Sequence, residues 1–153
     1  MTMRCSLVAL LVAAFCLGNN SASARDERKE GEQRNLVSES SPTFSHLNTR
    51  SKDFNPQLGV WYSGAFAPQQ ASFTFSSPRT ITRMTFKIEQ NPPGETDHVL
   101  LINGRLVYRF SGFTRDNQVL MYSATLDDVL NVTIRTLKSP SHIAWRGIEI
   151  FGY

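Results

Sequence analysis

The feature that most constrains the fold of this chain is the strict alternation of apolar and polar residues in TITRMTFKIE, residues 80–89. The residues of one parity are Thr82, Met84, Phe86 and Ile88, and those of the other are Arg83, Thr85, Lys87 and Glu89. Because successive side chains of a strand point to opposite faces of the sheet, this period of two predicts a strand with one buried face. Such a strand needs partner strands beside it and a second layer over its apolar face.

The rest of the chain after residue 54 has the same texture. Short apolar and β-branched runs, separated by Pro, Gly, Asn and Asp, occupy residues 71–75, 98–102, 105–110, 118–122, 129–137 and 142–152. No segment there places apolar residues at helical spacing over three turns. Short strands at intervals of about ten residues are typical of an antiparallel sandwich or barrel. We therefore predict an all-β fold.

Two details of these runs predict local structure. Asn103-Gly104 separates two of them, and this dipeptide accepts positive φ at both central positions of a turn, so it predicts a type I′ β-hairpin. In residues 129–137 the alternation predicts Leu130, Val132 and Ile134 facing inward. The same alternation predicts Asn131, Thr133 and Arg135 facing outward.

Residues 1–24 have the pattern of a secretory signal peptide. Arg4 precedes an apolar run over residues 7–17, and Ala22-Ser23-Ala24 forms a small-residue cleavage site. The apolar run is too short to span a bilayer, and no later segment is as apolar as a membrane span requires. Lipidation at Cys16 is the less favoured reading, because the bulky Phe15 precedes it. We expect an exported product, extracellular or periplasmic, without a membrane span.

Residues 25–53 differ in composition from the segment that follows. They contain charges of both signs, many serines and few apolar residues, which predicts a flexible lead-in. The domain prediction is therefore a signal peptide over 1–24, a lead-in over 25–53 and one β-sandwich domain over 54–153.

Cysteine usage and charge exclude several classes of protein. Cys5 and Cys16 are the two cysteines, and both lie in the predicted signal peptide, so the mature chain has no disulfide, thiolate metal site or cysteine nucleophile. Removing residues 1–24 removes Arg4 and no acid, which lowers the net charge from +3 to +2. A nucleic-acid partner is not expected, since such proteins usually carry a dense basic stripe.

The sequence also lacks recognisable catalytic motifs. Its three histidines are His46, His98 and His142, and no pair has metal-ligand spacing. There is no H-E-x-x-H helix, P-loop or G-x-S-x-G elbow. Asp127 and Asp128 are adjacent, so on a strand they point to opposite faces and cannot act as a pair. We expect a protein that is not an enzyme.

Three stretches resemble a known family. They are ITRMTFKIEQNPPGETDHVLLING, FSGFTRDNQVL and SPSHIAWRGIEIFGY. Together they resemble the discoidin-like domains related to the C-type domains of coagulation factors, which belong to the galactose-binding-like jelly-roll superfamily. The resemblance covers roughly residues 58–153, and Trp61 is similar to an early tryptophan of that family. It implies a jelly-roll β-sandwich that binds carbohydrate on cell surfaces or matrix, and less often lipid or protein.

The family often holds a structural calcium ion in an acidic loop before the early tryptophan. Here the corresponding stretch is KDFNPQLGVW, in which Asp53 and Asn55 are the oxygen ligands on offer. Calcium takes about six to eight oxygens, which backbone carbonyls would have to complete. We predict no cofactor.

Ligand sites of jelly rolls are normally built from loops at one end of the sandwich. Sugars need an aromatic face for stacking and charged or amide groups for their hydroxyls. The loops 63–70, 89–98, 111–117 and 138–145 contain such groups. The predicted ligand-binding residues are Phe66, Glu95, His98, Phe113, Arg115, Asn117 and His142.

Large aromatics beside strands lie in the core more often than on a binding surface, so Trp61 and Trp145 are predicted framework residues. Arg146 is predicted as a framework residue as well, with Glu149 or a buried backbone carbonyl as its expected partner. We predict a secreted, non-catalytic carbohydrate-binding or adhesion module. The alternatives are a protein-interaction or structural sandwich without a glycan site, and an accessory domain of a secreted hydrolase.

Overall fold

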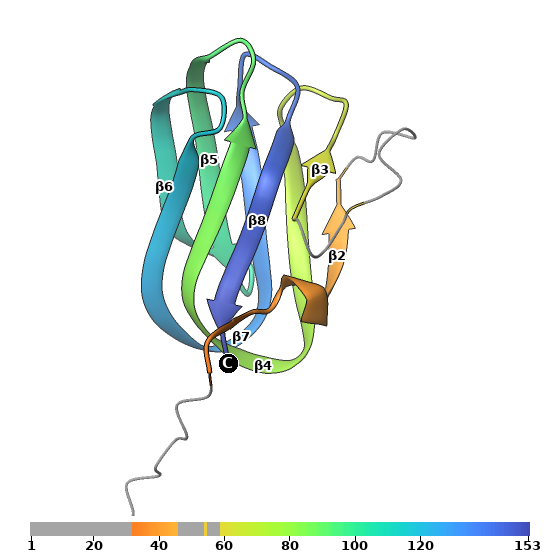
Figure 1. Ribbon diagram of the computed structural model, residues 1–153, viewed down its shortest axis with the longest axis vertical. Coiled ribbons are helices and arrows are strands. Elements are labelled where there is room, and N and C mark those ends of the chain that lie inside the picture. Colours follow the sequence, from red (N-terminus) through yellow and green to blue (C-terminus); the bar gives the residue numbers. More distant parts are fainter. Residues whose placement is uncertain (1–31, 46–53, 55–58) are drawn as a thin grey trace, which may run out of the picture.

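The computed structural model describes residues 32–45, 54 and 59–153. The predicted signal peptide, residues 1–24, falls outside these residues, and so do Asp53 and Asn55. The described elements are β1 (Arg34–Asn35), η1 (Val37–Glu39), β2 (Ser40–Phe44), β3 (Trp61–Tyr62), β4 (Gln69–Glu89), β5 (Gly94–Ile102), β6 (Arg105–Thr114), β7 (Val119–Lys138) and β8 (Ala144–Gly152). All strand pairs are antiparallel, and the fold is a β-sandwich, which confirms the predicted class (Figure 1).

Two long strands, β4 and β7, belong to both layers of the sandwich. Residues 69–74 of β4 pair with residues 131–136 of β7, and residues 83–87 pair with residues 119–123. The pairing register shifts between Thr74 and Arg83. The segment in which residues 69–74 of β4 pair with residues 131–136 of β7 lies in one layer with β2, β5 and β6. The segment in which residues 83–87 pair with residues 119–123 lies in the other layer with β8. β1 and β3 lie along the edge of β8 that faces away from β4.

The core lies between the two layers. Phe73, Leu100 and Ile134 come from one layer, and Met84, Phe86 and Ile148 from the other, all fully buried. The Phe44 and Trp61 rings stack 4.9 Å apart between centroids, and Phe86 meets Phe110 edge-on at 6.4 Å. Met84, Phe86 and Ile88 are buried as the alternation in residues 80–89 predicts.

The predicted hairpin at Asn103-Gly104 is confirmed. Asn103 has φ 49° and Gly104 has φ 77°, so both central residues adopt the left-handed conformation of a type I′ turn. The turn also contacts the neighbouring strand, because Asn103 Oδ1 accepts hydrogen bonds from the backbone N–H groups of Leu130 and Asn131, each at 2.9 Å.

The facing predicted for residues 129–137 is wrong at Leu130, and Thr133, predicted to face outward, is only 7% exposed. Val132 and Ile134 are buried, but Leu130 is 44% exposed and Val129 is buried in its place. Asp128 has φ 56°, a left-handed residue within β7, and it lies beside the register shifts of the β4–β7 ladder. Such an irregularity changes the parity of the alternation, so the facing of Leu130 follows the bend and not the local pattern.

The predicted lead-in over residues 25–53 is wrong for residues 34–44. Leu36 and Val37 are fully buried, and the Leu36 N–H donates to the Ile150 carbonyl at 2.7 Å. β1 pairs with the end of β8, and β2 pairs with residues 71–75 of β4. The folded unit therefore begins well before residue 54, because this short segment supplies two edge strands and part of the core.

Across residues 32–45, 54 and 59–153, the structure has no helix with the length and apolar character needed to cross a bilayer.

Candidate functional site

Four loops meet at one end of the sandwich, as the sequence predicts. They are residues 63–68, 90–93, 115–118 and 139–143 (Figure 1). Backbone hydrogen bonds hold them together: the Ser63 N–H donates to the Ile143 carbonyl and the Ile143 N–H donates to the Ala65 carbonyl, both at 2.9 Å. The Asn117 N–H donates to the Ile88 carbonyl at 3.0 Å. The loops thus form one fixed rim.

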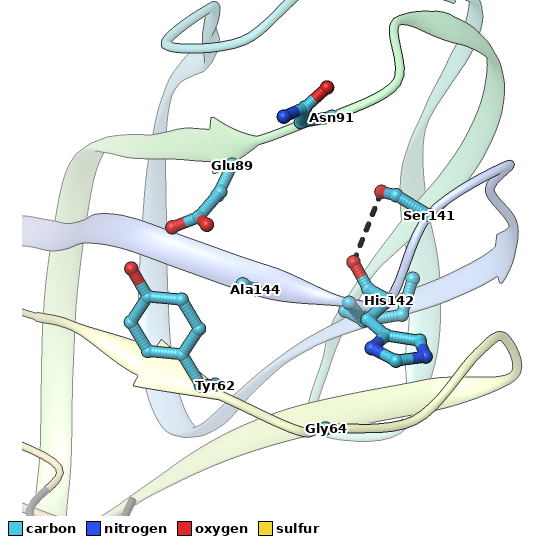
Figure 2. Close-up of a pocket in the computed structure, with 8 residues that line it drawn as sticks. Tyr62, Gly64, Glu89, Asn91, Ser141, His142 and Ala144 are labelled. Carbon is cyan, nitrogen blue, oxygen red and sulfur yellow. Dashed lines mark hydrogen bonds between the residues drawn. The ribbon is translucent and has the colours of Figure 1, made fainter.

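A cavity of about 340 Å³ opens in this rim (Figure 2). The residues that line it are Tyr62, Gly64, Glu89, Asn91, Ser141, His142, Ile143 and Ala144. Tyr62 ends β3, Glu89 ends β4 and Ala144 begins β8. Because strands position these groups, the wall of the cavity is set by the sandwich itself and the mouth by the loops.

The polar wall of the cavity is a hydrogen-bonded group around Glu89. The Tyr62 hydroxyl lies toward the Glu89 carboxylate, and its hydrogen bond to that carboxylate is the main reason that the pKa of Tyr62 is raised (Figure 2). Arg146 Nε donates to Glu89 Oε2 at 3.0 Å, and this bond is the main reason that the pKa of Arg146 is raised. Glu89 is therefore held from two sides as a carboxylate at the cavity wall.

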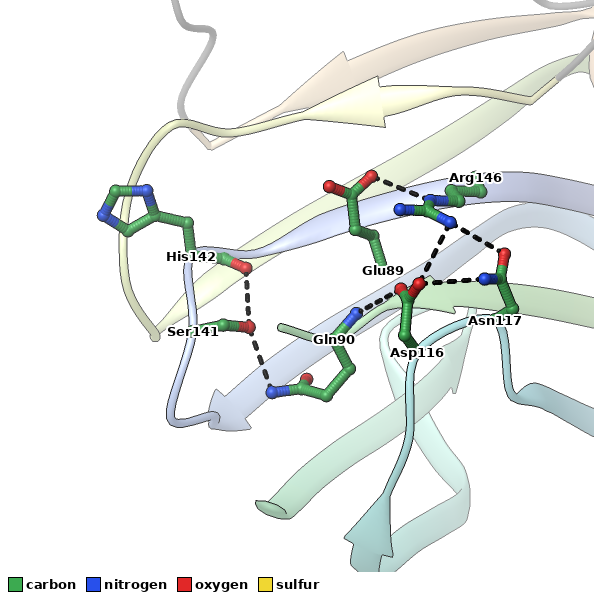
Figure 3. Close-up of polar contacts among 7 residues, drawn as sticks. All are labelled: Glu89, Gln90, Asp116, Asn117, Ser141, His142 and Arg146. Carbon is green, nitrogen blue, oxygen red and sulfur yellow. Dashed lines mark hydrogen bonds and ion pairs between the residues drawn. The ribbon is translucent and has the colours of Figure 1, made fainter. Parts of the chain in front are cut away.

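Arg146 connects the cavity to the loop 115–118 (Figure 3). Its Nη1 lies 2.9 Å from Asn117 Oδ1 and 3.1 Å from Asp116 Oδ2. Asp116 Oδ1 in turn accepts from the Gln90 N–H at 3.1 Å. One guanidinium therefore fixes the end of β4 and the 115–118 loop relative to β8.

Gln90 and Ser141 form the floor below the loop 139–143. Gln90 is 1% exposed, and its Nε2 donates to Ser141 Oγ at 3.0 Å and to the Pro92 carbonyl at 2.9 Å. Ser141 Oγ donates to the His142 carbonyl at 3.1 Å (Figure 3). Buried amide and hydroxyl groups with satisfied hydrogen bonds hold a loop in one conformation.

An aromatic pair lies at the mouth of the cavity. Phe66 and His142 meet edge-on with ring centroids 4.4 Å apart, although they come from different loops. Phe66 is 58% exposed, and its ring is available to the apolar face of a ligand. The sequence predicts both residues as ligand-binding, and the structure brings these two together.

The other predicted ligand-binding residues are spread over the rim. Asn117 lies behind the cavity as a partner of Arg146. Glu95 and Phe113 are cross-strand partners in β5 and β6, and the Arg115 guanidinium lies 6.0 Å from the centre of the Phe113 ring. These three residues form a separate group and do not line the cavity.

The rim position predicted for His98 is wrong. His98 is 1% exposed and packs against Trp145 with ring centroids 5.2 Å apart. Its Nδ1 lies 2.9 Å from Thr136 Oγ1. His98 is an inward-facing residue of β5 next to the buried Leu100, so the pattern of the strand and not its place near a loop sets its position.

The predicted framework residues lie in or beside the core. Trp61 and Trp145 are each 1% exposed and pair with one another across β3 and β8. Arg146 differs from expectation in its partners, which are Glu89 and Asp116 in place of Glu149. Glu149 accepts a hydrogen bond from Thr85 Oγ1 at 2.6 Å, on the outer face of the sheet.

Sequence reasoning did not select Tyr62, Glu89 and Asn91 as site residues. Glu89 has the parity of the solvated face of its strand, and Tyr62 follows a framework tryptophan. The available signal was position: both residues end a strand at the rim, where a side chain on the outer face can reach a loop.

Two chemical questions about this site have direct answers. Among the described residues, no three His, Cys, Asp or Glu side chains lie close enough together to hold a metal ion. Asp53 and Asn55, the two oxygen donors that the sequence offers in the loop where the family often holds calcium, are outside those residues. A serine–histidine pair does not form at His98, whose side-chain partner is Thr136, while Asp97 pairs with Arg109.

No protein-family model matches this chain, and no curated protein matches it. Solved structures do match. The family 32 CBM from C. perfringens NanJ, solved in complex with galactose, is 11% identical with a TM-score of 0.57, over 78% of this chain and 98% of that chain.

Two further solved structures are similar. A Streptococcus pneumoniae fucose binding module is 13% identical with a TM-score of 0.56, over 79% of this chain and 96% of that chain. Chitosan-binding module 2 of a chitosanase/glucanase from Paenibacillus sp. IK-5, in complex with chitotriose, is 15% identical with a TM-score of 0.57, over 76% and 98%. These likenesses show the fold, and they confirm the β-sandwich that the resemblance implied.

Proposed function

We propose that this protein is a non-catalytic carbohydrate-binding module whose ligand occupies the cavity between Tyr62, Glu89, Asn91 and His142. The observation that carries this proposal is the cavity itself: a carboxylate, a phenol and an amide line it, and the exposed Phe66 ring lies at its mouth. A sugar presents the complementary surface, with hydroxyl groups around its ring and an apolar C–H face.

The fixed geometry of the cavity supports the same function. Glu89 is oriented by Tyr62 and Arg146 before any ligand arrives, so a sugar hydroxyl meets an acceptor already in place. Preorganisation of this kind reduces the entropy lost on binding. Similar structures are a galactose complex, a chitotriose complex and a fucose binding module, which makes a sugar the first ligand class to test.

The proposed setting is outside the cell. Residues 1–24 have the pattern of a signal peptide, and a cysteine-free sandwich with a sugar site suits a secreted or periplasmic protein. We propose a cell-surface or matrix glycoconjugate as the natural partner, with adhesion as the result of binding.

The test is a binding titration of the chain without residues 1–24 against galactose, fucose, chitotriose and Lewis b. We expect at least one of these sugars to bind. Asn91→Ala and Phe66→Ala should weaken that binding about tenfold or more, because each removes one contact group, while the melting temperature stays unchanged. Absence of binding to all four sugars and to a broad glycan array would refute the proposed function.

Phe113→Ala is the matched control. Phe113 is 55% exposed, close to the 58% of Phe66, but its ring lies beside Arg115, whereas the Phe66 ring packs against His142, which lines the cavity. We expect its replacement to leave binding unchanged. Loss of binding in Phe113→Ala with normal binding in Phe66→Ala would move the site to the group of Glu95, Phe113 and Arg115.

A second candidate function is an accessory domain of a larger enzyme. The similar structure SpGH29 matches 77% of this chain but only 28% of its own length, so the same fold forms part of a larger chain there. Sugar binding without any hydrolysis of the bound sugar distinguishes the proposed module from a catalytic protein.

A further inference from the structure

A second cavity, of about 290 Å³, lies on the outer face of the layer that contains residues 69–74 of β4 and 131–136 of β7. The residues that line it are Ser45, Pro68, Gln69, Gln70, Arg135 and Leu137. Gln70 and Arg135 are direct cross-strand partners, and Leu137 follows Arg135 on the same face of β7. The cavity is therefore built on paired strands at the rim end of the sandwich.

This cavity has both of the surfaces that a sugar needs. Pro68 and the 42% exposed Leu137 supply an apolar floor. Arg135 Nε donates to Gln70 Oε1 at 2.9 Å, which orients the guanidinium by one nitrogen. Arg135 makes no ion pair with any residue that the structure describes, so its two terminal nitrogens remain available to neighbouring hydroxyl oxygens.

The loop 63–68 separates the two cavities and borders both. Gly64 lines the first cavity and Pro68 lines the second, and the exposed Phe66 lies between them in the chain. Four residues span at most about 14 Å, so a ligand of several sugar units can pass over this loop from one cavity to the other. Gln69 Nε2 donates to the Phe66 carbonyl at 3.0 Å, which ties the second cavity to the loop that presents the aromatic ring.

We propose that the second cavity is a further subsite for the same glycan, and that an oligosaccharide lies across Phe66 with one unit in each cavity. This inference rests on the proposed function and makes its ligand more specific. The preferred ligand is then a chain of several sugar units, and Arg135 donates to two hydroxyl oxygens of the unit in the second cavity. A single terminal sugar would fill the first cavity alone.

The test compares short and long probes in binding titrations. The pairs are galactose with GalNAc-β-1,3-galactose, and glucosamine with chitotriose. For a pair that binds, we expect the longer probe to bind the unmodified chain about tenfold more tightly than the single sugar. Arg135→Ala and Leu137→Ser should each remove most of that gain and leave the affinity for the single sugar within about twofold.

Arg105→Ala is the matched control, since it removes the same charge from an exposed residue at the opposite, hairpin end of the sandwich. It should keep the full gain, and melting temperatures identify any variant that fails to fold. Single sugars that bind as tightly as the longer probes, or a gain that survives both Arg135→Ala and Leu137→Ser, would overturn the second subsite alone. Absence of binding to every probe would overturn the proposed function as well.

Discussion

His98 shows how burial changes the acid–base chemistry of a single side chain. Its imidazole lies in the core against Trp145, and its pKa is lowered to about 4. Burial is the main cause because it disfavours the charged form, and the neighbouring Asp97 carboxylate opposes this effect by raising the pKa. In the unfolded chain the same group titrates near 6.5, so folding and protonation are linked.

The linkage predicts a loss of stability in mild acid. Between about pH 6.5 and pH 4 the unfolded chain binds a proton at His98 that the folded chain does not, so the free energy of unfolding falls as the pH falls. The full loss is about 3 kcal/mol. Denaturant titrations at pH 7.5 and pH 4.5 measure it in the unmodified chain and in His98→Asn, which cannot titrate. An equal pH dependence in both proteins would show that His98 is not the responsible group.

Trp145 is expected to be essential to the core. It is 1% exposed and packs against Phe86 with ring centroids 5.9 Å apart. Trp145→Ala should lower the free energy of unfolding by about 3–5 kcal/mol because it leaves a large cavity between the layers. Chemical denaturation measures the change. An unaltered denaturation midpoint together with lost sugar binding would make Trp145 a ligand contact and contradict its framework role.

At the scale of elements, the segment from β1 to β2 is expected to contribute to stability. Leu36 is fully buried between the end of β8 and the bend of β4, and its side chain lies near Gly152. Leu36→Ala should lower the free energy of unfolding by about 2–5 kcal/mol. Ser38→Ala is the control, since Ser38 is an exposed residue of η1 and should change little. Equal stability of both variants would mean that this segment is not part of the cooperative fold.

Arg146 connects β8 to the rim loops, and its replacement is expected to affect sugar binding more than stability. Its side chain is 37% exposed and its ion pairs are screened by solvent, so Arg146→Ala should change the melting temperature little. Sugar affinity should fall about tenfold, because Glu89 and the 115–118 loop lose their common partner. Titration and thermal melting of the same variant measure both. Normal affinity in Arg146→Ala would show that Glu89 needs no orientation.

How far the sequence predicts the elements depends on whether the information is local. The alternation in residues 80–89 and the Asn103-Gly104 turn are local signals, and both appear as predicted. Residues 71–75 and 80–89 are one strand, which the sequence divides because exposed polar residues occupy the bend between the layers. A bend and a loop have the same composition, so local pattern cannot separate them.

The site was predicted less completely because it depends on which loops meet. Phe66 and His142 carry the residue types that a sugar site needs; His142 lines the cavity, and the Phe66 ring packs against it. Glu89 and Tyr62 become site residues only through the pairing of β4 and β3 with β8. Pairing between distant strands is not encoded in local spacing, so these two residues could not be selected in advance.

At the scale of the whole molecule, the two layers share the backbone of β4 and β7. Neither layer can separate while the other stays intact, so a single cooperative unfolding transition is expected. A sugar that binds only the folded chain should raise the free energy of unfolding by about 2.7 kcal/mol at a hundredfold excess over its Kd. Denaturation with and without the sugar measures this rise. Two separate transitions would contradict the shared-strand account.

The position of the chain's last residue has a mechanical consequence. β8 runs from the rim loops to Tyr153 at the opposite end of the sandwich (Figure 1). A pull applied between a ligand held at the rim and Tyr153 acts along the axis of β8. The hydrogen bonds between β8 and β4 then bear the load in shear, many at once, and do not open one after another from an end. The sandwich is thus oriented to resist tension along the axis of β8.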